Sequence, residues 1–236
     1  MKKTLLIAAV IMLFAFAASA QTSSQSDQNS SGIDKELSNA TQIIQQMTGP
    51  SANAGIPQNV LDNAKCIAVV PNLIQAGFVV GGRHGSGVAT CRTAANQWSS
   101  PAPFSLSGAS FGAQIGAQSV DLIMMVMNQS GMQALRSGHF KVGGEVSATA
   151  GPVGREASAS AGWKSGILTY SRSNGAYAGA TVKGAEVQQD DSATKALYGS
   201  DISFSKILNG QAPQPKTAQA HDFMMAVQHA EQSASQ

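Results

Sequence analysis

Residues 104–128, FSLSGASFGAQIGAQSVDLIMMVMN, change their side-chain period midway and so indicate which faces of the chain are buried. Over residues 111–118, small or apolar side chains alternate with glycine and glutamine, which is typical of a strand with one buried face. Over residues 120–127 every side chain except Asp121 is apolar, which predicts a central strand covered on both faces, with a short buried helix as the alternative. A carboxylate in such a strand needs a partner, so we expect Asp121 to form a structural pair.

Turns are expected on both sides of this stretch. The glycine-rich GGRHGSG at residues 81–87 predicts a tight hairpin turn, with a loop that presents Arg83 and His84 to a ligand as the alternative. Asn174-Gly175 stands between two strand-like runs and is the strongest short-range signal for a hairpin. The chain between these points is therefore expected to be rich in antiparallel strands.

Helical periodicity is confined to short segments. Residues 33–47 place their apolar side chains on one stripe before a stop at Gly49-Pro50, and residues 192–198 form a short helical run that ends at Gly199. Strand patterns dominate the rest of the chain. The sequence therefore predicts the α+β class, as an antiparallel β-rich single domain with short peripheral helices.

The N-terminus has the three parts of a secretory signal peptide. Two lysines follow Met1, residues 5–17 are apolar, and Ala18-Ser19-Ala20 is an A-x-A cleavage site. The apolar run is shorter than the ~20 residues that a membrane-spanning helix needs. We therefore expect residues 1–20 to be removed and the chain to be exported, either periplasmic or secreted.

The remaining chain divides by composition into a lead, one domain and a tail. Residues 21–32 lack large apolar side chains and are expected to be a disordered lead. Residues 33–210 contain the strand and helix patterns of the domain. Residues 211–236 begin with a proline-containing linker and continue with apolar residues at helical spacing, so a C-terminal helix is possible there.

Charge is balanced overall but unevenly placed. Removing Lys2 and Lys3 leaves 13 basic and 13 acidic residues, which disfavours a nucleic-acid binder. Between residues 65 and 183, however, the sequence has nine basic residues and three acidic ones. This excess of positive charge is expected for a protein that binds an anionic surface. A solvated surface with scattered charges is the alternative. The candidate anion-binding residues are Lys65, Arg83, Arg136, Lys141 and Lys164.

The chain has two cysteines, Cys66 and Cys91. Export exposes them to oxidation, so we expect them to form a disulfide, which would stabilise the fold by ~3 kcal/mol if the geometry permits. Use of this pair as metal ligands or as a nucleophile is the alternative.

Signals for catalysis are weak. Residues 108–112 match the G-x-S-x-G pattern of a nucleophile elbow, but Ser110 leads into a strand pattern where an elbow requires a turn and then a helix. The four histidines lack metal-ligand spacing, and the glycines of residues 81–87 do not have the spacing of a phosphate-binding loop. The sequence therefore predicts no enzyme, no cofactor and no metal.

Several spaced motifs, found in one order, resemble the SYLF domain over residues 33–208. They are IPQNVLDNAKCIAVVP, GFVVGGRHGSGVATCR, WSSPAPFSLSGASFGAQIGAQSVDLIMMVMN, AGPVGREASAS, LTYSRSNGAYAGATVKGAEVQQDD and ALYG. The resemblance implies a non-enzymatic lipid-binding module, which in some eukaryotic members also binds actin filaments. An exported protein does not meet actin in its own cell, so we expect anionic phospholipid, and not actin, as the partner.

Two further functions remain open. One is a structural or protein-interaction role at the cell envelope, in which the tail around Phe223 is the docking helix for an envelope protein. The other, which the sequence favours least, is a serine hydrolase that uses Ser110.

Overall fold

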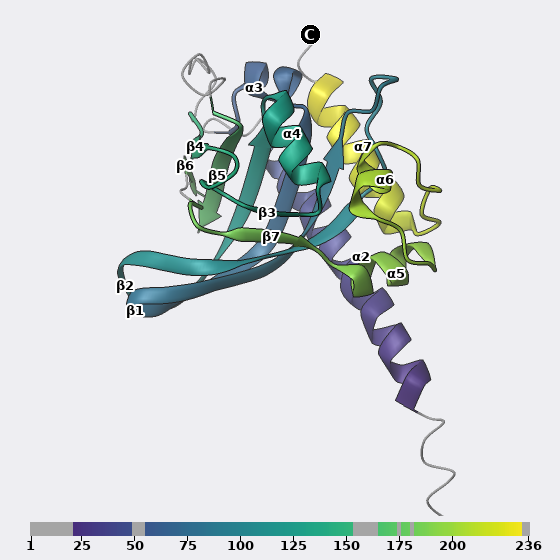
Figure 1. The fold of residues 1–236 in the computed structure, drawn as a ribbon, viewed down its shortest axis with the longest axis horizontal. Helices are drawn as coiled ribbons and strands as arrows, with labels where there is room; N and C mark the ends of the chain where they lie inside the picture. Colours follow the sequence, from purple (N-terminus) through teal and green to yellow (C-terminus); the bar gives the residue numbers. More distant parts are fainter. Residues whose placement is uncertain (1–20, 49–54, 153–164, 174–175, 180–181, 233–236) are drawn as a thin grey trace, which may run out of the picture.

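The computed structural model describes residues 21–48, 55–152, 165–173, 176–179 and 182–232, which form one curled mixed sheet with helices around it (Figure 1). The predicted α+β class is confirmed. The strands are β1 (Cys66–Cys91), β2 (Ala102–Val126), β3 (His139–Lys141), β4 (Ala148–Ala150), β5 (Ile167–Ser173), β6 (Ala176–Gly179) and β7 (Glu186–Gln189). The helices are α2 (Gln21–Thr48), α3 (Gln58–Asn63), α4 (Gln129–Arg136), α5 (Asp191–Tyr198), α6 (Phe204–Leu208) and α7 (Ala218–Gln232).

The sheet is organised around a long antiparallel ribbon of β1 and β2. Pairing runs from Cys66 opposite Val126 to Ala89 opposite Ala102. The middle of the ribbon leaves the body as an arm, which we define as residues 73–83 of β1 and 108–120 of β2 (Figure 1). The glycine-rich residues 81–87 thus lie inside β1, and the turn predicted there is wrong.

The rest of the sheet grows outward from β2. Its first part pairs with β7 and its last part with β5, so the strand order is β3-β7-β2-β5-β4. Strand β6 pairs with residues 170–173 of β5, next to residues 167–169, which pair with β4. All of these pairs are antiparallel except β4 with β5. The predicted antiparallel character therefore describes most of the sheet.

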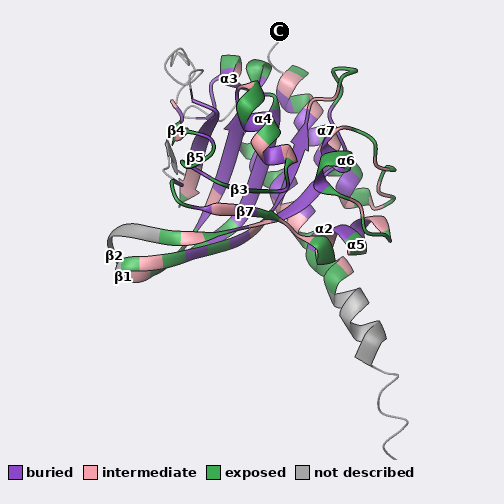
Figure 2. Cartoon of the chain, in the orientation of Figure 1, coloured by how far each residue is buried: buried purple, intermediate pink, exposed green. Residues whose placement is uncertain are grey.

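Residues 120–127 form a central strand with both faces covered, as predicted. Leu122, Met124 and Val126 point into a core cluster that includes Phe104 and Phe140. The intervening Ile123 and Met125 point to the other side, into a cluster shared with α2 and α7. Burial on both faces explains why this segment is a continuous apolar run. Figure 2 shows how strongly buried residues are concentrated in this part of the sheet.

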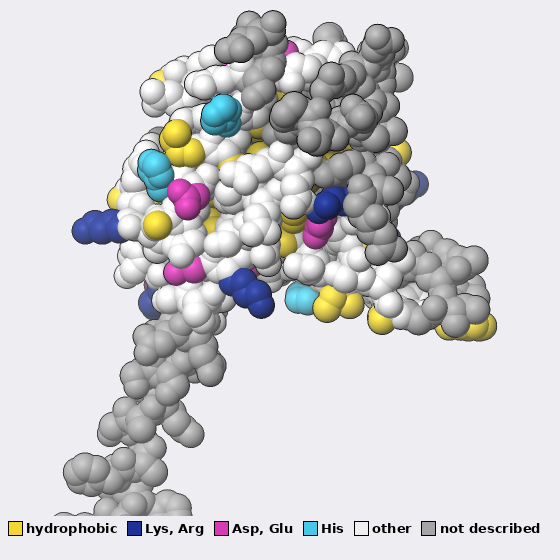
Figure 3. Space-filling model, turned by 180° about the vertical axis from the view of Figure 1, so that it is seen from behind, with side chains coloured by type: hydrophobic (Ala, Val, Ile, Leu, Met, Phe, Trp, Pro, Cys, Tyr) yellow, Lys and Arg dark blue, Asp and Glu magenta, His cyan; other side chains and the backbone are white. Residues whose placement is uncertain are grey.

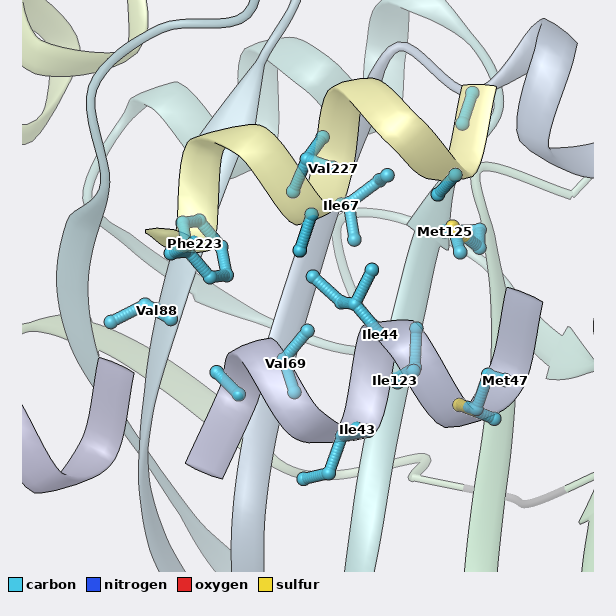
Figure 4. Close-up of a cluster of buried hydrophobic side chains, with 14 of the residues drawn as sticks. Ile43, Ile44, Met47, Ile67, Val69, Val88, Ile123, Met125, Phe223 and Val227 are labelled. Carbon is cyan, nitrogen blue, oxygen red and sulfur yellow. The ribbon is translucent and has the colours of Figure 1, made fainter. Parts of the chain in front are cut away.

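Helices α2 and α7 lie side by side on the outer face of the sheet. Figure 4 shows Ile44 of α2 between the sheet residues Ile67 and Val69 and the α7 residues Phe223 and Val227. Both α7 side chains are fully buried. The tail around Phe223 therefore packs on its own domain, so this face of α7 is not a free docking surface for an envelope protein.

The N-terminal part of α2 differs from the sequence-based expectation. Residues 21–32 were expected to be disordered, whereas the structure has one helix from Gln21 to Thr48. Once buried residues such as Ile33 and Leu37 hold the helix in place, each added polar residue gains a backbone hydrogen bond without a new nucleation step. Residues 1–20, the predicted signal peptide, lie outside the described residues.

In the part of the chain that the structure describes, none of the helices has the length and hydropathy that would let it cross a membrane.

The predicted disulfide between Cys66 and Cys91 is confirmed. It joins the first and last residues of β1, whose Cα atoms lie 4.0 Å apart, so the two ends of this folded strand are covalently fastened. Both cysteines are fully buried.

We expect a Cys66→Ala/Cys91→Ala variant to lose about 3 kcal/mol of unfolding free energy, because the unfolded chain regains the freedom of the closed loop. Guanidinium denaturation of the oxidised protein and the variant measures the difference. Adding a reductant during unfolding should destabilise the wild type and leave the variant unchanged. Equal stability of the two oxidised proteins would show that the bond does not fasten the fold.

Phe223 and Met225 provide a matched test of the packing of α7. Phe223 is fully buried and Met225 is 47% exposed on the same helix. We expect Phe223→Ala to lower the unfolding free energy by about 3–5 kcal/mol and Met225→Ala to change it by less than about 0.5 kcal/mol. Thermal or chemical denaturation measures both, and similar losses in the two variants would contradict the packing of α7 against the sheet.

Candidate functional site

The arm is the most exposed apolar feature of the described chain. Among its side chains, Ile74, Phe78 and Val80 are 56%, 68% and 59% exposed. Hydrophobic side chains along the arm are visible in Figure 3. Isolated exposed apolar residues are common on protein surfaces, but three large ones on one projecting ribbon form a candidate contact surface.

Residues 108–120 of the arm form an edge of the sheet within the described residues. Within the described residues β1 pairs with β2, and β2 pairs with β7 at residues 104–107 and with β5 at residues 121–126, so residues 108–120 have one neighbouring strand. Edge strands usually carry charges or prolines that prevent further pairing. The sequence has no Asp or Glu from residue 63 to residue 120, so the arm lacks acidic protection at its edges.

Glycines shape the tip of the arm. A Cβ atom on Gly77 would lie 2.2 Å from the Cα of Gly81, and one on Gly81 would lie 2.2 Å from the carbonyl oxygen of Ala76. β1 therefore folds sharply back on itself between these two glycines, which any side chain would prevent. The residues between them include Phe78 and Val80, so the turn is what pushes these side chains outward.

Residues 111–118 of β2 were predicted to have one buried face, and the described part of this segment does not have one. Ala117 and Gln118 are both exposed, although they point to opposite faces of the strand. The side chains of residues 110–116, Ser110 among them, lie outside the described residues. The backbone there is strand on both sides of Ser110, so the strand–turn–helix geometry of a nucleophile elbow is not formed.

Asp121 anchors the root of the arm. A register shift between Val70 and Leu73 leaves Asn72 with a left-handed backbone (φ 52°), and its N–H donates to Asp121 Oδ1 at 3.1 Å. The other carboxylate oxygen of Asp121 lies 3.8 Å from the guanidinium of Arg172 on β5. The predicted structural pairing of Asp121 is confirmed, and it fixes the point where the arm leaves the body.

A pocket of about 160 Å³ lies beside this root. Helix α2 supplies one wall and β1 supplies the other. The lining residues are Gly32, Lys35, Glu36 and Asn39 from α2 and Pro71, Asn72 and Ser86 from β1. One lining residue, Asn72, lies two positions before the exposed Ile74 in the sequence.

Glu36 is the unusual group of this pocket. Burial raises the pKa of its carboxyl group to about 8, and the nearby carboxylate of Asp190 contributes to the same shift. Its Oε1 atom is buried and has no hydrogen-bond partner among the described residues. Glu36 is therefore mostly protonated at neutral pH.

The raised pKa of Glu36 predicts a pH dependence of stability. A carboxyl group that binds its proton more tightly in the folded state than in the unfolded state favours folding at low pH, and this advantage is lost as pH rises from about 4.5 to about 8. We therefore expect Glu36→Gln to raise the melting temperature more at pH 8 than at pH 4.5. A difference between variant and wild type that is the same at both pH values would contradict the raised pKa.

The four predicted anion-binding residues that the structure describes are not brought together as one exposed surface. Lys65 and Lys141 are exposed, and Lys164 lies outside the described residues. Arg83 is 9% exposed, and burial lowers its pKa. The guanidinium of Arg136 donates to the carbonyl oxygens of Arg92 (2.9 Å) and Leu208 (3.3 Å). Their role in binding stays a prediction.

Arg92, which the sequence did not single out, joins α7 to the sheet. Its guanidinium lies 2.9 Å from Glu231 and 4.6 Å from the ring centroid of Trp98. The indole N–H of Trp98 donates to the same carboxylate at 3.0 Å. These contacts hold α7 against the sheet.

The described residues include no group of three or more His, Cys, Asp or Glu side chains placed to hold a metal ion.

Comparison with known proteins identifies the family. The family model named Ysc84, described as Las17-binding protein actin regulator, matches residues 107–230. The chain belongs to this family. The predicted resemblance to the SYLF domain is thereby confirmed.

Relatives of this chain occur in yeasts and mammals. LAS seventeen-binding protein 3 of Saccharomyces cerevisiae is 32% identical over 192 residues, which are 78% of this chain and 42% of the relative. An SH3 domain-containing protein of Schizosaccharomyces pombe is 33% identical over 197 residues (80% and 46%). SH3 domain-containing YSC84-like protein 1 of Homo sapiens is 30% identical over 200 residues (82% and 58%). The chain spans about half the length of these relatives. No solved structure matches it.

These relatives correct the predicted partner. Anionic lipid was expected and actin was set aside, whereas the family description and the relatives' names refer to Las17 binding and actin regulation. The lipid prediction depended on an excess of basic residues in the middle of the chain. Two of those residues, Arg83 and Arg136, are turned at least partly into the protein, whereas Lys65, Lys141 and Lys183 are exposed.

Proposed function

We propose that this chain is a non-enzymatic protein-binding module that binds actin filaments through the apolar tip of its arm. The observation that carries the proposal is the exposure of Ile74, Phe78 and Val80 on a ribbon that projects from the body. The family's description as an actin regulator supports actin as the protein partner. The predicted signal peptide bears on the compartment in which the domain meets its partner. It does not bear on which surface of the domain binds the partner.

The arm has the properties of a protein-contact surface. Apolar aromatic and aliphatic anchors at the centre of an interface supply most of its binding energy. Removing the remaining exposed area of three large side chains from water contributes roughly 1–2 kcal/mol per side chain. Because about 1.4 kcal/mol corresponds to a factor of ten in affinity, loss of two anchors is expected to weaken binding by at least about tenfold.

The test is cosedimentation of the full chain with actin filaments. We expect the wild type to sediment with the filaments and Phe78→Ser/Val80→Ser to stay in the supernatant. Met225→Ser is the matched control, because it removes an exposed apolar side chain on α7 and away from the arm. Thermal denaturation should show that all three proteins are folded.

Two results would contradict the proposal. Equal sedimentation of the wild type and the arm variant would show that the arm is not the contact. Absence of wild-type sedimentation, with flotation on anionic phospholipid vesicles instead, would show that actin is not the partner.

A further inference from the structure

We propose that the pocket at the root of the arm is a binding site for a cationic side chain, lysine or arginine, with Glu36 as the counter-charge. The site is argued from the residues of the pocket alone. The further step, that the cation belongs to the same protein that the arm contacts, rests on the proposed function.

The pocket has the size for such a group. Its volume of about 160 Å³ is roughly ten times the ~10–15 Å³ that a cavity needs, on the same measure, to hold one water molecule. The walls come from two elements that contact each other, α2 and β1, so the space does not depend on a single loop. Helix α2 crosses the sheet near the place where the arm leaves the body (Figure 1).

Two ionisable side chains, Lys35 and Glu36, line the pocket, and a second carboxylate, Asp190, lies near Glu36. Burial and, after it, the carboxylate of Asp190 at the N-terminus of α5 raise the pKa of the Glu36 carboxyl group. Lys35 also lines the pocket, but consecutive residues of a helix do not face each other, and no ion pair joins Lys35 to Glu36. From β1, the lining residues Pro71, Asn72 and Ser86 bring no charge.

Glu36 is therefore a carboxyl group that the protein itself does not satisfy. Its buried Oε1 atom lacks a donor among the described residues, and such a group is costly in a protein interior. An ammonium or guanidinium group in the pocket would supply the opposite charge to the Glu36 carboxyl group. The side-chain oxygens of Asn39, Asn72 and Ser86 offer acceptors for the remaining N–H groups of the cation.

Binding of the cation is coupled to release of a proton. With a pKa of about 8, Glu36 holds its proton at neutral pH in the free protein, and an adjacent positive charge favours the ionised form. Cation binding should therefore strengthen as pH rises from about 6.5 to about 8.5. The carboxylate of Asp190 favours the cation in the same way, whereas Lys35 opposes it.

The direct test uses small probes with the full chain and needs no partner protein. The probe is acetyl-arginine methylamide, with the lysine equivalent to compare guanidinium with ammonium and the neutral acetyl-citrulline methylamide as control. We expect either cationic probe, at tens of millimolar, to lower the Glu36 pKa in a carboxyl-carbon NMR titration by at least about one unit. The citrulline probe should leave the pKa unchanged. An unchanged pKa with both cationic probes would overturn the site.

A second measurement tests whether the partner supplies the cation. In the actin cosedimentation assay, Glu36→Gln should weaken binding several-fold at pH 8 and remove its increase with pH. Glu145→Gln is the matched control, because it removes an exposed carboxylate that does not line the pocket. If Glu36→Gln binds filaments as the wild type does at every pH, the partner does not use the pocket. If the wild type itself does not bind actin, the proposed function fails, and the probe titration still decides whether the pocket binds cations.

Discussion

The antiparallel pairing of β1 with β2 is the interaction on which the rest of the structure depends. Every other strand attaches directly or indirectly to β2, and both core clusters are built from alternate faces of this ribbon. The ribbon is folded on itself, which requires close approach of its backbone at Gly77 and Gly81. The disulfide between Cys66 and Cys91 joins the two ends of β1 covalently. The longest strand of the fold therefore bends back at Gly77 and Gly81, and its ends are held together by this bond.

This arrangement explains how a two-stranded arm can stand away from the body. A two-stranded ribbon alone is marginally stable in water. Here both strands continue into the central sheet, and Asp121 fixes the root by accepting from Asn72 and pairing with Arg172. The body can therefore hold apolar side chains such as Phe78 in solvent without burying them in its own core. The pocket beside the root is lined by Asn72, which directly precedes the arm in the sequence.

Features that follow from local pattern could be predicted from the sequence. The apolar run at residues 120–127 indicates burial on both faces whatever its neighbours are, and two cysteines in one chain leave one pairing.

The arm could not be predicted in this way. Residues 81–87 have the composition of a turn but form strand, because the glycines serve close packing against Val69 and Val70. Phe78 and Val80 belong to a run that resembles a core strand, and their exposure depends on where the ribbon leaves the body. Glu36 looks like any acid on the polar face of a helix until β1 and α5 are placed beside it.

The central claim is that the arm is the surface that meets the partner, and hydrogen–deuterium exchange with and without actin filaments tests it most directly. Burial of the arm in a complex should slow the exchange of amides in residues 73–83 and 108–120. Amides of α7, which packs on the sheet beside α2, should keep their rates. Unchanged exchange throughout the arm, together with protection elsewhere in the chain when filaments are bound, would contradict this account.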